Sequence, residues 1–376
     1  MQANRIAVLR GGGLGDLVFT LPALEALRAR FPVAEITLIG EPWLAGLVLG
    51  RRAVDGGPAL VDRHVPLPAA ASAWLAGRGG PADARASQDV ASEVAARAPD
   101  LAIQLNGGGR HSNPFLTSLG AAVTVGLRAP DAPPLDRWVP YVYYQSEVMR
   151  ALEVVGLLGA TPVSIEPRVL PGAPVDGPLP GGLGGEGGPL VALHPAASDA
   201  RRCWPARSFG ELARRLSAAG ARVAVVGVDG DRHRVREICE VAGPQAGVVD
   251  LAGRLDLPAL ERVLARASVV VANDSGPIHL ARALGARTVG IYWCGNVINA
   301  GPAWRARHRP AISWRLECPE CGLDCTRHRC GHDVSFVADV TVDEVGSSAL
   351  ELLDATTDDA AETRMMPAWT TATTSS

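Results

Sequence analysis

Residues 268–292, SVVVANDSGPIHLARALGARTVGIY, predict the fold of the chain around them. The apolar run Ser268–Ala272 is typical of a buried strand, and a short polar loop separates it from a predicted helix over Pro277–Leu284. A second apolar run, Thr288–Tyr292, predicts the next strand. Strand, helix and strand at this spacing indicate a βαβ unit, and therefore a parallel sheet covered by helices.

The same alternation runs through the rest of the chain. Further strands are predicted over Ile6–Leu9, Ala34–Ile39, Leu101–Leu105, Leu190–Leu193 and Arg222–Val226, and further helices over Pro22–Phe31, Ser208–Ala219 and Leu257–Ala267. Residues 171–189 interrupt the alternation with a Gly- and Pro-rich segment that is typical of a linker. We therefore expect an α/β chain with domains over 1–170 and 190–340, a helix over 341–354 and a disordered tail over 355–376.

The composition excludes several classes of protein. The 376 residues are enough for two domains with separate cores. A formal net charge of −3 argues against a general nucleic-acid binder, and all 36 basic Lys+Arg residues are Arg, so no step can use a lysine amine. The chain shows no signal-peptide pattern after Met1 and no apolar run of about 18 residues. We therefore expect a cytoplasmic protein without a transmembrane segment, and peripheral membrane contact stays open.

A glycine-rich loop follows the first predicted strand. Residues 11–15, Gly-Gly-Gly-Leu-Gly, let the backbone approach a ligand closely and leave N–H groups free to bind an anion. The loop does not match the dinucleotide-binding pattern G-x-G-x-x-G. Asp16 comes next, and its carboxylate suits either a general base for a hydroxyl or a helix cap. The residues alone leave both interpretations open.

Two further loops also follow predicted strands, where ligands of parallel sheets bind. In the first, Asp274 or Ser275 can cap a helix whose free N–H groups suit a phosphate, and His279 lies about one turn after Ser275. The alternative is a capping motif with a packed histidine. In the second, Ser198 and the pair Arg201–Arg202 fit phosphate contact, and the alternative is two solvated arginines beside a packed tryptophan.

A cysteine-rich segment stands near the end of the second domain. Its members, spaced C-x2-C-x3-C-x4-C, are Cys318, Cys321, Cys325 and Cys330. His328 and His332 are interleaved with them. Thiolates and imidazoles this close in sequence can hold a structural Zn²⁺. Disulfides or packed thiols are the alternatives.

Taken in order, these segments resemble glycosyltransferase family 9, the ADP-heptose:lipopolysaccharide heptosyltransferase family. Residues 5–24 resemble its first strand, its G-D turn and its T-x-P-A-L helix start. The stretches His194–Ser198 and Arg202–Pro205 resemble its HPG[AS] loop and its K-x-W-P motif. The stretch Asn273–Ala281 is similar to its signature D-[ST]-G-x-x-H-x-A. The resemblance covers roughly residues 5–350.

The resemblance implies a GT-B fold, in which two Rossmann-like domains face each other across a cleft. The N-terminal domain would take a glycan or glycolipid acceptor, and the C-terminal domain would take a nucleotide-sugar, typically ADP-heptose. Transfer would invert the anomeric centre without a catalytic metal or another cofactor, in the synthesis of lipopolysaccharide or a cell-surface glycan. By motif match, Asp16 would be the general base, and Gly13 and Gly15 would belong to the acceptor-side loop. The same match assigns the donor to Ser198, Arg202, Asp229, Asp274, Ser275, Gly276 and His279.

Three departures from the family pattern bear on the donor. Arg202 replaces the lysine of K-x-W-P, Ala196 replaces a glycine, and residues 292–302 replace an F-G-x-[ST] stretch. Two other functions stay open: a nucleotide-sugar epimerase with a similar fold, and a nucleotide-sugar-binding protein without catalysis. The presence of both Asp16 and the signature around Asp274 argues against the second of these.

Overall fold

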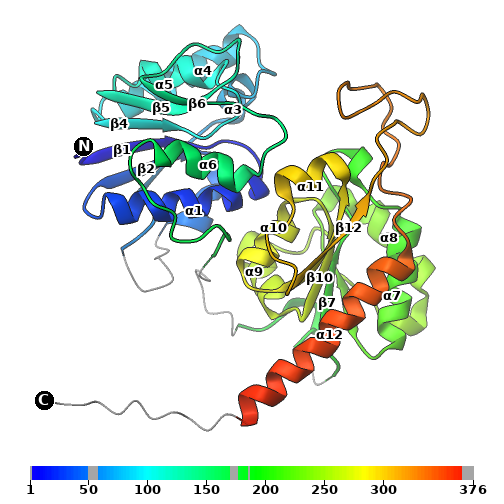
Figure 1. Cartoon of the computed structure of the whole chain (residues 1–376). Helices are drawn as coiled ribbons and strands as arrows, with labels where there is room; N and C mark the ends of the chain where they lie inside the picture. The colour runs from blue at the N-terminus through cyan, green and yellow to red at the C-terminus, as the bar shows by residue number, and fades with distance from the viewer. Residues whose placement is uncertain (1, 50–57, 170–176, 185–186, 366–376) are drawn as a thin grey trace, which may run out of the picture.

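The computed structural model describes residues 2–49, 58–169, 177–184 and 187–365. Within these ranges the chain forms two six-stranded parallel sheets, one on each side of the predicted linker, and helices flank both sheets (Figure 1). The predicted α/β architecture of two parallel sheets is therefore confirmed.

The N-terminal sheet has the order β3-β2-β1-β4-β5-β6. Its strands are β1 (Arg5–Leu9), β2 (Glu35–Gly40), β3 (Arg63–Pro66), β4 (Leu101–Gln104), β5 (Val123–Arg128) and β6 (Arg137–Pro140). Its helices are α1 (Leu14–Arg30), α2 (Ala45–Val48), α3 (Ala69–Leu75), α4 (Pro81–Ala95), α5 (Ser112–Ser118) and α6 (Glu147–Gly156). The strand order reverses between β1 and β4, so a crevice is expected at their carboxyl ends.

The C-terminal sheet repeats this arrangement with the order β12-β11-β10-β7-β8-β9. Its strands are β7 (Leu190–His194), β8 (Arg222–Val225), β9 (Val249–Asp250), β10 (Val269–Asn273), β11 (Arg287–Trp293) and β12 (His308–Ser313). Its helices are α7 (Ala206–Ala218), α8 (Arg232–Ala242), α9 (Leu257–Arg266), α10 (Gly276–Ala283), α11 (Cys294–Ala300) and α12 (Val342–Met365). Here the order reverses between β7 and β10.

Helix α1 begins eight residues before the predicted start at Pro22. The start is set by Asp16, whose carboxylate accepts the Gly13 N–H at 2.7 Å and so caps the first turn. Pro22 therefore lies inside the helix, because burial of its neighbours on all sides holds the segment helical despite the missing N–H. The prediction took the proline as the start signal and was wrong by two turns.

Helix α12 extends beyond the predicted end at residue 354 as far as Met365. Leu352 and Leu353 are buried, and Arg287 donates to the carbonyls of Leu352 and Ala355, both at 3.3 Å, so this part of the helix is tied to β11. Residues 366–376 of the predicted tail lie outside the described residues, as do 171–176 and 185–186 of the predicted linker.

The two domains share an apolar core where α1 packs against α10. Two further apolar clusters lie on the outer faces of the sheets, one in each domain. The contact between α1 and α10 brings the loop before α1 next to the loop before α10. None of the helices in the described residues has the length and apolarity needed to cross a bilayer.

Candidate active site

The first turn of α1, which follows the glycine-rich loop after β1, presents Asp16 at the carboxyl end of the N-terminal sheet. One carboxylate oxygen of Asp16 accepts the Gly13 N–H, and the other accepts a hydrogen bond from Arg10 Nη2 at 2.8 Å. The side chain is still 44% exposed. The two interpretations left open by the sequence are therefore compatible, because Asp16 caps α1 and also presents its carboxylate to a ligand.

A cavity of about 460 Å³ lies over this loop. Its walls are mostly polar and include Asp16, Glu147, Arg150 and the Gly107–Gly109 turn after β4. Arg10 is buried beneath it and lies 3.8 Å from Glu147 as well as beside Asp16. The cavity wall therefore contains two carboxylates, Asp16 and Glu147, and both lie within 4 Å of the buried Arg10 guanidinium.

Sequence reasoning missed Glu147 and Arg150. Glu147 begins α6 and pairs with Arg150, which is buried on the otherwise apolar inner face of that helix. The signal in the sequence was an arginine, Arg150, inside an apolar helical stretch, since an arginine that is buried there needs a partner.

The loop after β10 places Asp274 in the C-terminal domain opposite the Asp16 loop. Its side chain is 2% exposed and accepts hydrogen bonds from Arg202 at 3.0 Å and from His279 Nε2 at 3.1 Å. Burial alone would raise the pKa of Asp274, but these two donors outweigh it and the pKa is lowered. Burial lowers the pKa of His279. The pair therefore holds a charged carboxylate beside a neutral imidazole.

The first turn of α10 packs directly on the first turn of α1. A Cβ added at Gly276 would lie 2.7 Å from the Leu14 Cβ, and one added at Gly15 would lie 2.9 Å from His279 Cδ2. The His279 ring also contacts Phe19 of α1, with 4.5 Å between ring centroids. Two positive helix ends, about 260 residues apart in sequence, therefore meet at the domain interface, and each carries an aspartate.

Ser275, the residue before α10, is held by the neighbouring strand. Its hydroxyl lies 3.1 Å from His194 Nδ1 at the end of β7. Burial lowers the pKa of His194 to about 4, so this imidazole is neutral near pH 7. Asn273 is also buried, donates to the Pro195 carbonyl at 2.7 Å and accepts the Trp204 N–H at 2.9 Å. Sequence reasoning passed over Asn273, which ties the two donor-side loops together.

Arg202 joins these loops to a second cavity, of about 560 Å³. Its guanidinium contacts Asp274, donates to Ser198 Oγ at 2.7 Å and lines the cavity. The other charged side chains in the wall are Asp199, Arg201, Arg327 and Arg329. Hydrogen bonds from Arg201 lower the pKa of Asp199 to about 2. Tyr143 and Tyr144 of the N-terminal domain close the opposite wall, so this cationic cavity lies between the two domains.

The remaining predicted site residues lie apart from these loops. Asp229 follows β8, its side chain is 82% exposed, and it pairs with Arg232 at 2.5 Å. It lines neither cavity.

In the cysteine-rich segment, the ligand atoms of Cys318, Cys321, Cys330 and His332 lie within 4.8 Å of one another. Cys325 is not in that group, although its Sγ lies 3.9 Å from the Cys330 Sγ.

Two doubly wound domains, with polar loops facing each other at both reversal points, define a GT-B architecture. Residues 180–321 match the model of glycosyltransferase family 9 (heptosyltransferase). The resemblance predicted from the motifs is confirmed over these residues of the C-terminal domain.

One curated relative is a lipopolysaccharide heptosyltransferase 2 from Salmonella typhimurium, 33% identical over 108 residues, which are 28% of this chain and 31% of that protein. The match therefore spans about a third of the relative's length.

The solved structures that resemble this one extend over nearly the whole chain. The E. coli ADP-heptose lps heptosyltransferase II superposes with a TM-score of 0.70 at 18% identity, covering 93% of this chain and 99% of the other. An E. coli heptosyltransferase, WaaC, solved with ADP-2-deoxy-2-fluoro heptose, superposes with a TM-score of 0.65 at 19% identity, covering 92% and 99%. At these identities the likeness establishes the shared fold.

Proposed function

We propose that this chain is an inverting glycosyltransferase that moves a sugar, by family default a heptose, from an ADP-activated donor to a hydroxyl of a glycan or glycolipid. The observation that carries the proposal is the meeting of two loops, in which Gly15 lies against His279 and so brings Asp16 to the side of the Asp274 loop. A single displacement needs these two elements together, namely a base for the acceptor and a cationic site for the departing diphosphate.

On the acceptor side, the Asp16 carboxylate takes the hydroxyl proton as the acceptor oxygen attacks the anomeric carbon. The new carbon–oxygen bond forms on the face opposite the diphosphate, whose bond to that carbon breaks, so the configuration inverts. Hydrogen bonds from Arg10 and from the Gly13 N–H fix the orientation of the Asp16 carboxylate, and a fixed orientation favours proton transfer from the acceptor hydroxyl to this base. The cavity beside it would hold the acceptor.

On the donor side, negative charge develops on the diphosphate as the bond breaks. The N–H groups at the start of α10 and the Arg202 guanidinium offer donors for that charge. The four arginines around the interdomain cavity, with Asp199 as the one acidic side chain in its wall, favour an anionic ligand there. These groups stabilise the leaving group without a metal ion in the proposed step.

The donor is proposed from the relatives. The E. coli heptosyltransferase that was solved with an ADP-linked fluoro-heptose supports an ADP-heptose donor for this chain. Synthesis of lipopolysaccharide or a related surface glycan, in the cytoplasm or at its membrane surface, completes the proposal. Replacement of the family lysine by Arg202 keeps the positive charge that a diphosphate needs, and changes its geometry from a point charge to a planar fork.

A donor panel tests this function. Purified protein is incubated with ADP-, UDP- and GDP-activated sugars, with and without a panel of glycan acceptors, and free nucleotide is measured. We expect ADP release that depends on both the sugar and the acceptor. A sugar that is isomerised without any acceptor would instead identify an epimerase, and binding without turnover would identify a non-catalytic protein.

A further inference from the structure

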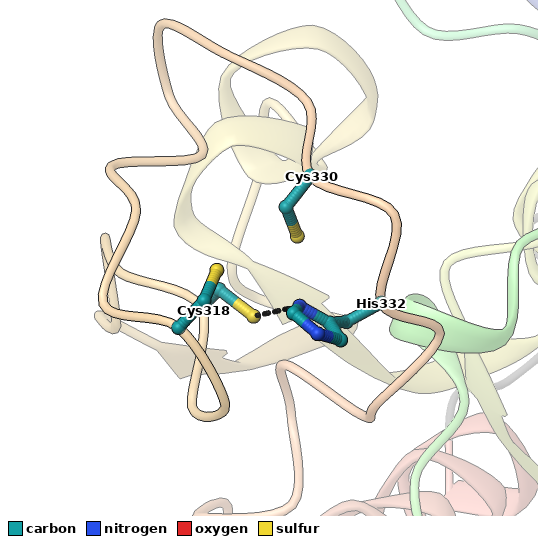
Figure 2. A group of neighbouring side chains, drawn as sticks. Cys318, Cys330 and His332 are labelled. Atoms are coloured by element: carbon teal, nitrogen blue, oxygen red, sulfur yellow. Dashed lines mark hydrogen bonds between the residues drawn. The ribbon is translucent and has the colours of Figure 1, made fainter.

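The cysteine-rich segment between β12 and α12 contains a cluster of metal-ligating side chains. The sulfur atoms of Cys318, Cys321 and Cys330 and a ring nitrogen of His332 all lie within 4.8 Å of one another. Figure 2 shows Cys318, Cys330 and His332 converging from two arms of the loop toward one point. Three thiols and an imidazole are the donor set that Zn²⁺ prefers in structural sites.

The distances fit a tetrahedral ion. A zinc ion with sulfur at about 2.3 Å and nitrogen at about 2.1 Å separates those two atoms by about 3.6 Å. The Cys318 Sγ and His332 Nδ1 atoms lie 3.6 Å apart. A disulfide needs about 2.05 Å between sulfurs, whereas Cys325 and Cys330 are 3.9 Å apart and each of the seven described cysteines is free.

The backbone around the first two ligands is shaped to present both thiols on one side. The Gly322 N–H donates to the Cys318 carbonyl at 2.9 Å, and the Cys318 N–H donates to the Leu323 carbonyl at 2.9 Å. Gly322 has a φ of +68°, a left-handed conformation that glycine adopts without strain. This tight turn directs Cys318 and Cys321 toward the arm that carries Cys330 and His332.

The segment has almost no apolar core of its own. Its ends are anchored, because Trp293 Nε1 donates to the Arg315 carbonyl at 2.5 Å and the Phe336 N–H donates to the Arg201 carbonyl at 2.8 Å. Between residues 314 and 335, all of which the structure describes, Cys318 alone is buried. A loop of this length without a core needs a cross-link to hold one conformation.

The same segment lines the interdomain cavity. Residues 325–329, which lie between the ligands Cys321 and Cys330, form one wall of it. The Tyr144 hydroxyl of the N-terminal domain donates to the Thr326 carbonyl at 2.6 Å, so the segment also contacts the other domain. We propose that Cys318, Cys321, Cys330 and His332 bind one Zn²⁺, and that this ion holds residues 325–329 along the cavity. Arg327 and Arg329 thereby stay where an anionic ligand meets them.

Metal content of the full-length protein tests the ligand set. Cys321 and His332 are exposed, so Cys321→Ser and His332→Asn remove a ligand without removing core contacts. Cys325→Ser tests the choice of the fourth ligand, because this thiol lies 3.9 Å from Cys330 Sγ but outside the group that contains His332. We expect about one zinc per chain in the wild type and in Cys325→Ser, and loss of zinc in the other two variants. Absence of zinc from the wild type, loss of zinc in Cys325→Ser, or a disulfide between ligand cysteines would overturn the proposal.

Trypsin cleavage tests the role of the ion. Cleavage after Arg327 and Arg329 should become roughly tenfold faster or more when a chelator removes zinc, because the loop then opens locally, and re-addition of zinc alone should restore the slow rate. Cys321→Ser should be cleaved fast with or without zinc. Equal cleavage rates with and without the ion would refute the structural role. The effect of the loop on the donor rests on the proposed transferase function, whereas zinc content and cleavage do not, so either idea can fail alone.

Discussion

Replacing Asp16 by Asn separates the two roles that the structure gives this residue. The side chain caps α1 through the Gly13 N–H and pairs with the buried Arg10. Asparagine keeps a side-chain oxygen that can accept the Gly13 N–H, so the change at the cap is the loss of a negative charge near the helix N-terminus, which costs about 0.3–1 kcal/mol of unfolding free energy. Loss of the ion pair adds about 1 kcal/mol or less, because the carboxylate is 44% exposed and solvent screens it. We therefore expect a total destabilisation of at most about 2 kcal/mol, which leaves the protein folded.

The expected catalytic loss is larger. Removing a general base lowers the turnover number by about 10²- to 10⁴-fold, which corresponds to about 3–5 kcal/mol of transition-state free energy at about 1.4 kcal/mol per factor of ten. Donor affinity should stay within about twofold, since Asp16 lines the acceptor-side cavity and not the cationic cavity. The assay is ADP release at saturating donor and acceptor, with donor affinity measured by calorimetry.

Asp83→Asn is the matched control. Asp83 caps α4 through the Gly80 N–H at 2.8 Å, with the same geometry that Asp16 has in α1, and it lines neither cavity. This variant should lose about 0.3–1 kcal/mol of stability, through the same loss of charge near a helix N-terminus, and retain full turnover. Near wild-type turnover in Asp16→Asn, or an equal loss in both variants, would refute the assignment of Asp16 as the base.

Three further predictions concern the donor side. Arg202→Ala should lower the unfolding free energy by about 1–3 kcal/mol in urea titrations, because it removes a charged donor from buried Asp274; Arg202→Lys should recover part of this, and an unchanged midpoint in Arg202→Ala would contradict it. Asn273→Ala should cost about 1–3 kcal/mol, since it removes the buried acceptor of the Trp204 backbone N–H; a loss below about 1 kcal/mol would show that the two loops are held by other contacts. Burial lowers the pKa of His194 from 6.5 to about 4, so the unfolded chain binds a proton that the folded chain does not, and stability falls as the pH drops from about 6.5 to about 4. His194→Gln should remove about 2–3 kcal/mol of that fall, and a profile parallel to the wild type would contradict it.

Elements with strong local signals could be predicted from the sequence. The central strands of both sheets follow from apolar runs and their spacing, since a strand buried on both faces must be apolar throughout. The edge strands β3, β6, β9 and β12, together with β5 and most of the helices, were not predicted. The start of α1 could not be predicted, because proline often marks the first turn of a helix. Here the contact between Asp16 and Gly13 places the start eight residues before Pro22. Where two residues in one segment can each begin a helix, the contacts in the folded chain decide between them, and the sequence pattern does not show those contacts.

The candidate site divides in the same way. The glycine-rich loop and the signature around Asp274 are local motifs, so their residues could be named in advance. Glu147 and Arg150 could not be named, because their link to Asp16 runs through the buried Arg10 from a distant part of the chain. Spacing also could not choose between Cys325 and His332 as the fourth ligand, since the turn of the loop decides which side chain reaches the cluster.

Nucleotide release from an ADP-activated heptose, followed with the purified wild-type protein in the presence and absence of acceptor glycans, tests whether this chain is an inverting glycosyltransferase. We predict ADP release only when donor and acceptor are both present, with a product whose anomeric configuration is opposite to that of the donor. Release of ADP with retention of configuration would contradict the proposed single displacement. Failure to bind any nucleotide-activated sugar at the Arg202 and Asp274 loops would contradict the function itself.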